Sequence, residues 1–139
     1  MTAFLGHVNL FTQDPVRLSA FYGELFGFKE NEAFRSPIFR GLDGGNGFRF
    51  GFNAPDAYDL LGLADRRPSG NPVTSCYITF EVPDVETVAV LAAKAVELGG
   101  RIIKEPYDSY YNARQCVLAD PEDNVFRINY SRASRTRPV

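Results

Sequence analysis

The chain has 139 residues, of which 45% are hydrophobic and 23% charged, with a formal net charge of −2 and a pI near 5.4. A chain of this length forms a single domain and buries about two-thirds of the surface that its unfolded form exposes. The apolar content excludes an intrinsically disordered protein, and the slightly acidic balance argues against nucleic acid or an anionic membrane as a partner.

The sequence carries no targeting or membrane signal. No apolar stretch approaches the roughly 20 residues that span a bilayer, and the first residues lack the basic and apolar segments of a secretion signal. The two cysteines, Cys76 and Cys116, lie in predicted strands without a CxxC spacing, and we interpret them as small buried side chains of a reduced protein. We therefore expect a cytoplasmic protein.

The first half begins with a strand over about residues 4–12, which leads into a helix. Asp14 is a typical N-cap, and Pro15 suits the first helical turn because its missing N–H has no partner there anyway. Gly27 predicts the end of the helix. Four apolar residues at helical spacing form its buried face: Leu18, Phe21, Tyr22 and Leu25.

Three further strands are predicted at 28–34, 38–42 and 47–53. The turn Asp43-Gly44-Gly45-Asn46-Gly47 favours a hairpin between the last two. Residues 54–72 break the strand pattern. They hold a short helix within 54–63 and then a linker rich in Pro, Gly, Ser and Asn.

The second half begins at Val73 and follows the same order. A strand around 76–82 leads to Asp84, which caps a helix that closes at Gly99-Gly100. Strands at 101–104, 114–118 and 125–130 follow, with a Tyr-rich loop at 106–112 and a turn at 120–124. The last residues, 131–139, carry three arginines without an apolar pattern and predict a flexible, solvated tail.

The two halves therefore form an internal repeat. His7 corresponds to Tyr77, Leu10 to Phe80 and Asp14 to Asp84. We predict an α+β fold of two βαβββ modules, at about 4–53 and 73–130, joined by the linker 54–72. Because each helix covers one face of its sheet, the other face must be buried by the matching sheet. The sheets would then curl around a shared cavity as a curved, partly open mixed β-barrel with the helices outside.

Two sets of motifs carry a family resemblance. The first half has Gly6-His7-Val8-Asn9-Leu10 before Asp14, then Phe21-Tyr22 and Leu25-Phe26-Gly27-Phe28. The second half has Phe80-Glu81-Val82-Pro83-Asp84-Val85, Gly99-Gly100, Glu105-Pro106 and Asp120-Pro121-x-x-Asn124-Val125-Phe126. Up to Tyr130 the chain resembles the vicinal oxygen chelate superfamily, which includes glyoxalase I, extradiol dioxygenases and bleomycin-resistance proteins. The resemblance implies this fold and a homodimer, whereas the family hosts many chemistries on one scaffold.

Metal enzymes of that family place one ligand on each of four strands, typically His or Gln, Glu or His, His, and Glu. By distance from the flanking motifs, the resemblance maps these positions onto His7, Arg49, Tyr77 and Arg127, with Gly51 replacing Arg49 if that strand is shifted in register. A guanidinium has no lone pair for a metal and repels a dication. His7 is the only histidine in the chain. We therefore expect no metal and no other cofactor, with His7 as the only candidate ligand.

The same inward positions predict contacts to a small molecule. Strand alternation puts His7 and Asn9 on one face together with Phe11. Arg49 and Arg127 suit a carboxylate or phosphate, which a guanidinium binds through two hydrogen bonds.

Glu81 offers a competing interpretation. It shares the inward phase of its strand with Tyr77 and Thr79, so one or both arginines could pair with it, or with another acid, and close the cavity.

Aromatic residues have two alternative roles. Tyr107, Tyr110 and Tyr111 crowd a loop at the predicted cavity mouth, where they either stack on a planar ligand or form a dimer contact. The phenylalanines at 48, 50 and 52 are out of phase with Arg49, and we expect them to pack under the helices as core.

The leading functional prediction is a metal-independent protein that binds an anionic or aromatic small molecule without chemistry, as the bleomycin-resistance branch does. Its predicted ligand contacts are His7, Asn9, Arg49, Tyr77, Glu81, Tyr107, Tyr110, Tyr111 and Arg127. One alternative is a lyase, isomerase or dioxygenase that recruits a divalent ion through His7 and acids such as Glu81. The other is an inert dimerisation domain.

Overall fold

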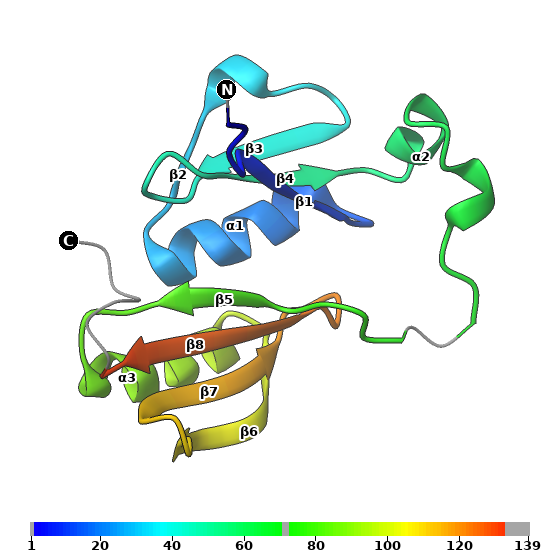
Figure 1. The fold of residues 1–139 in the computed structure, drawn as a ribbon. Helices are drawn as coiled ribbons and strands as arrows, with labels where there is room; N and C mark the ends of the chain where they lie inside the picture. Colours follow the sequence, from blue (N-terminus) through cyan, green and yellow to red (C-terminus); the bar gives the residue numbers. More distant parts are fainter. Residues whose placement is uncertain (1, 71–72, 133–139) are drawn as a thin grey trace. The chain divides into compact units, whose positions relative to one another are not determined.

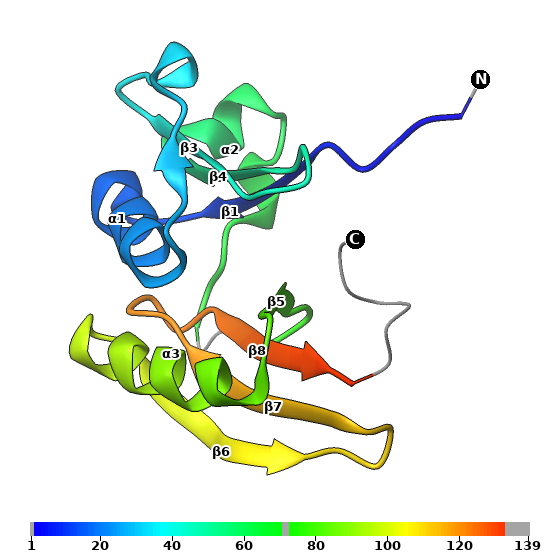
Figure 2. The ribbon, with the colours of Figure 1, turned by 90° about the vertical axis from the view of Figure 1, so that its left-hand side faces the viewer.

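The computed structural model describes residues 2–70 and 73–132. It divides the chain into two compact units, Met1–Pro72 (unit 1) and Val73–Val139 (unit 2). Each unit contains one four-stranded mixed sheet with a helix along one face, as Figures 1 and 2 show. The predicted α+β class and the βαβββ order of both halves are confirmed.

Unit 1 has the sheet order β1-β4-β3-β2. Its edge strand β1 runs parallel to β4, and the other neighbours are antiparallel. The elements of unit 1 are β1 (His7–Phe11), α1 (Pro15–Phe26), β2 (Lys29–Glu30), the 3₁₀ helix η1 (Glu32–Phe34), β3 (Phe39–Asp43), β4 (Arg49–Asn53), α2 (Asp56–Leu60) and the 3₁₀ helix η2 (Ala64–Arg66).

Helix α1 begins and ends where the sequence predicts. The carboxylate of Asp14 accepts a hydrogen bond of 3.0 Å from the backbone N–H of Arg17, which satisfies one of the free N–H groups of the first turn. Gly27 takes a left-handed conformation with φ 74°, and its N–H bonds to the carbonyl of Gly23 at 2.9 Å.

The core of unit 1 lies between α1 and the sheet. Tyr22 of α1 is almost completely buried, and its ring centroid lies 4.9 Å from that of Phe50 and 5.8 Å from that of Phe52. Because side chains alternate along a strand, Arg49 and Gly51 then face away from α1. The prediction that Phe50 and Phe52 belong to the core is confirmed.

Unit 2 repeats this arrangement with the sheet order β5-β8-β7-β6. Its edge strand β5 is parallel to β8, and the remaining pairs are antiparallel. The elements of unit 2 are β5 (Ile78–Glu81), α3 (Val85–Glu97), β6 (Arg101–Asp108), β7 (Ala113–Ala119) and β8 (Val125–Ser131).

Helix α3 packs through small side chains. Its buried residues are Val88, Ala92 and Ala95, and the sheet side of the core includes Phe126 and Ile128, neither of which is exposed. Phe126 and Ile128 point toward the helix, so the intervening Arg127 and the following Asn129 lie on the opposite face. The alternation of side chains along β8 therefore decides which of them are available to a ligand.

The predicted strand 28–34 is wrong in its second part. Strand β2 covers only Lys29–Glu30, and residues 32–34 form the 3₁₀ helix η1. The Asn31 side chain accepts a hydrogen bond of 3.2 Å from the N–H of Ala33 and thereby starts a helical turn, which competes with the strand.

The predicted loop 106–112 is also wrong in part, because β6 continues to Asp108 and places Tyr107 on the strand. Pro106 is tolerated there because β6 is an edge strand, and its pairing with β7 is irregular between Lys104 and Tyr107. The loop itself contains only residues 109–112.

Three predicted positions at element ends also differ. Strand β5 begins at Ile78, so Cys76 precedes it and is exposed instead of buried. Phe48 lies in the turn before β4 and is 44% exposed, so it is not core. Strand β8 extends to Ser131, into the predicted tail, and residues 133–139 of that tail lie outside the described residues.

Within residues 2–70 and 73–132, no helix combines the length and the apolar character needed to traverse a bilayer.

We predict that Asp84→Ala destabilises the protein at neutral pH and that this difference fades in acid. The side-chain hydroxyl and the backbone N–H of Thr87 both donate to Asp84, and these bonds lower the pKa of its carboxyl group. A group whose native pKa is lowered stabilises above its unfolded pKa, near 3.9, and loses this contribution as pH falls through the native pKa.

Urea unfolding followed by circular dichroism between neutral and acidic pH measures this effect. Glu97→Ala at the other end of α3 serves as the control and removes no capping bond. A gap between wild type and Asp84→Ala that stays constant down to the acid limit would contradict this assignment.

Candidate functional site

In unit 1, the sheet face opposite α1 carries the predicted residues of β1 and β4. The parallel register places His7 opposite Arg49 and Asn9 opposite Gly51. Of the two residues that the sequence offers for this position, Arg49 is therefore the neighbour of His7.

Gly51 leaves room for two side chains on this face. A Cβ atom at residue 51 would lie 2.0 Å from Oδ1 of Asn9 and 2.8 Å from the ring of Phe39. Such separations are shorter than any normal contact, so the amide of Asn9 and the ring of Phe39 occupy the space above Gly51. The missing side chain of Gly51 thus fixes how Asn9 lies on the sheet.

Aromatic rings from the flanking segments cover other parts of the same face. The guanidinium carbon of Arg49 lies 4.2 Å from the ring centroid of Phe34 in η1, a cation–π contact. Phe11 stacks on Tyr58 of α2, with 3.8 Å between centroids. The segment predicted as a linker therefore contributes Tyr58, which is buried, to the packing of unit 1.

In unit 2, the face opposite α3 carries a connected polar network around Arg127. The Nε atom of Arg127 donates to Oγ1 of Thr79 at 3.1 Å, and Nη1 donates to the hydroxyl of Tyr111 at 3.0 Å and to Oε1 of Gln115 at 3.3 Å. The guanidinium carbon lies 5.2 Å from the ring centroid of Tyr77. Four residues, from β5 and the residue before it, from the β6–β7 loop and from β7, thus hold one cation in place.

Gln115 joins Arg127 to a row of polar side chains across the sheet. The strand register aligns Tyr107 with Gln115, Gln115 with Asn129, and Asn129 with Glu81. We call these four residues the polar row. Gln115 is 3% exposed, accepts from the hydroxyl of Tyr111 at 2.8 Å and donates to the hydroxyl of Tyr107.

The end of the polar row leaves one buried atom without a partner. Nδ2 of Asn129 donates to Oε2 of Glu81 at 2.7 Å, whereas Oδ1 of Asn129 is buried and has no hydrogen-bond partner among the described residues. Buried polar atoms are nearly always hydrogen-bonded, so an orphaned acceptor on this face is unusual.

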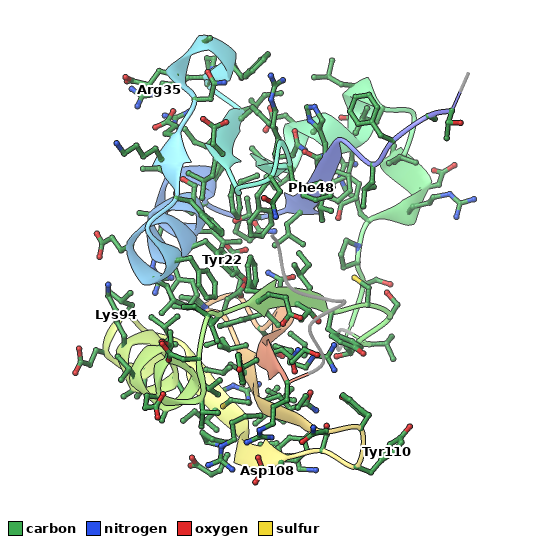
Figure 3. All side chains as sticks on the ribbon, turned by 60° about the vertical axis from the view of Figure 1, so that its left-hand side comes forward. Tyr22, Arg35, Phe48, Lys94, Asp108 and Tyr110 are labelled. Atoms are coloured by element: carbon green, nitrogen blue, oxygen red, sulfur yellow. The ribbon has the colours of Figure 1, made fainter. Side chains whose placement is uncertain are left out.

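Several of the predicted contacts thus meet in unit 2. Tyr77, Glu81, Tyr107, Tyr111 and Arg127 lie on one sheet face, and Glu81 bonds to Asn129 in place of the arginine that the competing interpretation assigned to it. Tyr110 does not join them: it is 99% exposed and projects outward from the β6–β7 loop, as Figure 3 shows.

Sequence reasoning missed Gln115 and Asn129, and it noted Thr79 only for its phase. The alternation of β7 and β8 could have found them, because residue 115 is out of phase with the buried Cys116 and residue 129 is in phase with Arg127. Neutral amides carry no charge signal in a sequence, so their residue type alone does not indicate a site.

Cys116 takes no part in this face. Its side chain is fully buried on the helix side and donates to the carbonyl oxygen of Lys104 at 3.2 Å. Burial, with a smaller contribution from the charge of Glu105, raises the pKa of the thiol to about 11. A thiol in this state is not a nucleophile at neutral pH.

Unit 1 also contains a separate cavity of about 470 Å³ between α1 and the β2–β3 edge. Its charged lining is already paired: Arg35 donates twice to Glu30, both at 2.7 Å, and these bonds lower the pKa of Glu30. The remaining arginine of the lining, Arg40, donates to backbone carbonyls at 2.6 and 2.9 Å. The cavity therefore offers no unpaired charge comparable with that of Arg127.

The family assignment rests on the sequence as well as on this fold. The sequence model of the Glyoxalase/Bleomycin resistance protein/Dioxygenase superfamily matches residues 4–128. The chain belongs to this superfamily. The resemblance predicted from the motifs is confirmed, whereas no curated protein matches the sequence.

Solved structures of the glyoxalase superfamily are similar over almost the whole chain. A glyoxalase/bleomycin resistance protein/dioxygenase family enzyme from Burkholderia phytofirmans PsJN is 48% identical, with a TM-score of 0.87 over 92% of this chain and 98% of that chain. Two further structures share the fold. A glyoxalase-related enzyme from Fulvimarina pelagi is 21% identical, with a TM-score of 0.79 over 94% of this chain and 89% of that chain. A lactoylglutathione lyase from Agrobacterium tumefaciens is 14% identical, with a TM-score of 0.69 over 94% of this chain and 95% of that chain.

The metal site of the superfamily's enzymes does not fit the residues of this chain. The four mapped positions hold one imidazole, one phenol and two guanidinium groups, and Arg127 has its charge fixed in place by three hydrogen bonds. Guanidinium groups are not metal ligands and repel a dication. Within residues 2–70 and 73–132, no three His, Cys, Asp or Glu side chains are grouped so as to hold an ion.

We predict that Gly51→Ala destabilises the protein by about 1–3 kcal/mol, because the added methyl group must displace Asn9 and the ring of Phe39. Gly44→Ala is the matched control, since its Cβ would meet only a carbonyl oxygen at 3.6 Å, an ordinary contact. Urea denaturation of both variants measures the difference. Equal stability of the two variants would show that Asn9 and Phe39 are free to move away from Gly51.

Proposed function

We propose that this protein binds a small anionic, partly aromatic molecule on the sheet of unit 2 without using a metal ion. Arg127 would hold the anionic group, and Tyr77 and Tyr111 would contact the apolar part of the ligand. This function deepens the family assignment, which by itself leaves both substrate and metal dependence open.

The observation that carries the proposal is the hydrogen bonding of Arg127. Its Nε and Nη1 atoms are held by Thr79, Tyr111 and Gln115, all neutral. Its Nη2 atom makes no hydrogen bond within the described part of the chain, and the guanidinium forms no ion pair there. A cation that is oriented by neutral partners and keeps free N–H groups is suited to a carboxylate or phosphate.

The surroundings of Arg127 support an aromatic component in the ligand. Tyr77 is 56% exposed and Tyr111 is 47% exposed, so both rings have free surface. Tyr77 already lies against the guanidinium, and Tyr111 touches it through its hydroxyl. A planar anion on Arg127 would therefore lie within reach of two aromatic faces. The predicted contacts His7, Asn9 and Arg49 of unit 1 remain predictions.

One observation favours an enzyme as the second candidate. The structure from Burkholderia phytofirmans PsJN, 48% identical to this chain, is described as a family enzyme. A divalent-metal-dependent lyase, isomerase or dioxygenase would need a metal bound through His7 and through acids outside the four mapped positions, such as Glu81.

We predict that Arg127→Met weakens the binding of 4-methylbenzoate by about tenfold or more, because a charge-assisted contact is worth about 1.5–3 kcal/mol. Arg66→Met removes an exposed arginine of η2 and serves as the matched control. Isothermal titration calorimetry measures both affinities, and circular dichroism checks that each variant is folded. Equal affinity of the two variants would contradict the assignment of Arg127.

We predict that the purified protein contains no stoichiometric Ni, Zn, Mn or Fe and that chelation changes neither its melting temperature nor its affinity for 4-methylbenzoate. A bound metal would stabilise the native state by mass action, so its removal would lower the melting temperature. Elemental analysis of wild type and His7→Ala gives the metal content. One equivalent of metal, lost in His7→Ala, would favour the enzyme instead.

A further inference from the structure

We infer that the ligand of unit 2 is a small zwitterion, whose anionic group binds Arg127 and whose ammonium group binds at the Asn129–Glu81 end of the polar row. This inference rests on the proposed function and names the chemical class of its ligand. It depends on Asn129 and Glu81, the end of the polar row with which Arg127 forms no hydrogen bond.

The orientation of the Asn129 amide follows from its neighbour. An ionised Glu81 can only accept hydrogen bonds, so the Nδ2 group of Asn129, which donates, must be the end that faces it at 2.7 Å. The opposite orientation would place two acceptor oxygens against each other. Oδ1 of Asn129 is therefore committed to the other direction, where it finds no donor in residues 2–70 and 73–132.

This orphaned oxygen is deeply placed. Asn129 is 6% exposed, and a buried acceptor without a donor costs free energy that a ligand could recover. The strand phase puts Asn129 on the same face as Arg127, two residues away on β8, where alternate residues are about 7 Å apart. A small ligand held by Arg127 can thus reach the amide of Asn129.

Two acceptor groups lie at this end of the row. The carboxylate of Glu81 has two oxygens, of which Oε2 bonds to Asn129, and the oxygen Oδ1 of Asn129 has no donor. A hydroxyl group has only one hydrogen to donate, whereas an ammonium group has three and also offsets the charge of Glu81. The chemistry of this end therefore favours a cation with several donors.

The two ends of the site carry opposite charges, which also orients the ligand. An anion is attracted to Arg127, and a cation is attracted to Glu81. Gln115 lies opposite Asn129 in the register and accepts from Nη1 of Arg127, so the guanidinium leans toward the polar row. A ligand bound in the reverse direction would meet like charges at both ends, and this repulsion gives the site its specificity.

Probes that differ only in one charge test the inference. We would titrate the full-length protein with two zwitterions, phenylalanine and 4-(aminomethyl)benzoate, which differ in the separation of their charges. Their anion-only analogues are 3-phenylpropionate and 4-methylbenzoate. Calorimetry gives the ratio of dissociation constants within each pair.

We expect at least one zwitterion to bind about tenfold or more tightly than its own anionic analogue. We expect this ratio to fall toward one in Glu81→Gln and in Asn129→Leu, of which Glu81→Gln is the conservative change should Asn129→Leu fail to fold. Glu97→Gln, on α3, removes an equal charge far from the row in sequence and should leave the ratio unchanged.

The results of these titrations distinguish the zwitterionic ligand from the proposed function. Anionic analogues that bind as tightly as both zwitterions would overturn the zwitterion and leave the proposed function standing. A preference for zwitterions that Glu81→Gln and Asn129→Leu both retain would also overturn it, because the ammonium group would then bind elsewhere. No binding by any of the four compounds would overturn the proposed function and this inference with it.

Discussion

Arg127 lies on the sheet face of unit 2 opposite α3, and its three hydrogen-bond partners there are all neutral. This arrangement fixes the direction of the guanidinium without neutralising it. Arg35 in unit 1 shows the opposite case, since Glu30 and Glu32 both pair with it. The difference explains why only one of these arginines is a candidate for binding an anion. The remaining features of the site, from Gln115 to the orphaned oxygen of Asn129, are arranged around this charge.

The two units show how one fold accommodates different surfaces. In both, the helix-facing positions are apolar and close-packed, with Phe50 and Phe52 in unit 1 and Phe126 and Ile128 in unit 2. Packing density restricts these positions severely. The opposite faces differ: unit 1 carries the rings of Phe39 and Tyr58, and unit 2 carries the polar row. The fold therefore depends on one face of each sheet, while the other face is free to determine function.

Sequence reasoning was most successful where a local rule applies. Asp14 and Asp84 cap their helices, Gly27 ends α1, and the alternation of β4 and β8 gives the correct faces for Arg49 and Arg127. It failed where a contact distant in the sequence or a competing local bond decides the structure. Asn31 starts a helical turn in place of a strand, and Tyr107 joins a strand because β7 pairs with it. No sequence pattern predicts that Gln115 connects Tyr107, Tyr111 and Arg127, because this network forms only when β6, β7 and β8 pair in the folded sheet.

Anomalous diffraction from crystals soaked with both 4-bromobenzoate and Mn²⁺ would show whether Arg127 binds an anion and whether His7 binds a metal, since bromine and manganese give separate signals. We expect a bromine peak over the sheet of unit 2, with the carboxylate on Nη2 of Arg127 and no manganese peak at His7. A manganese ion coordinated by His7, with Arg127 turned away from Gln115 and Tyr111, would contradict this expectation.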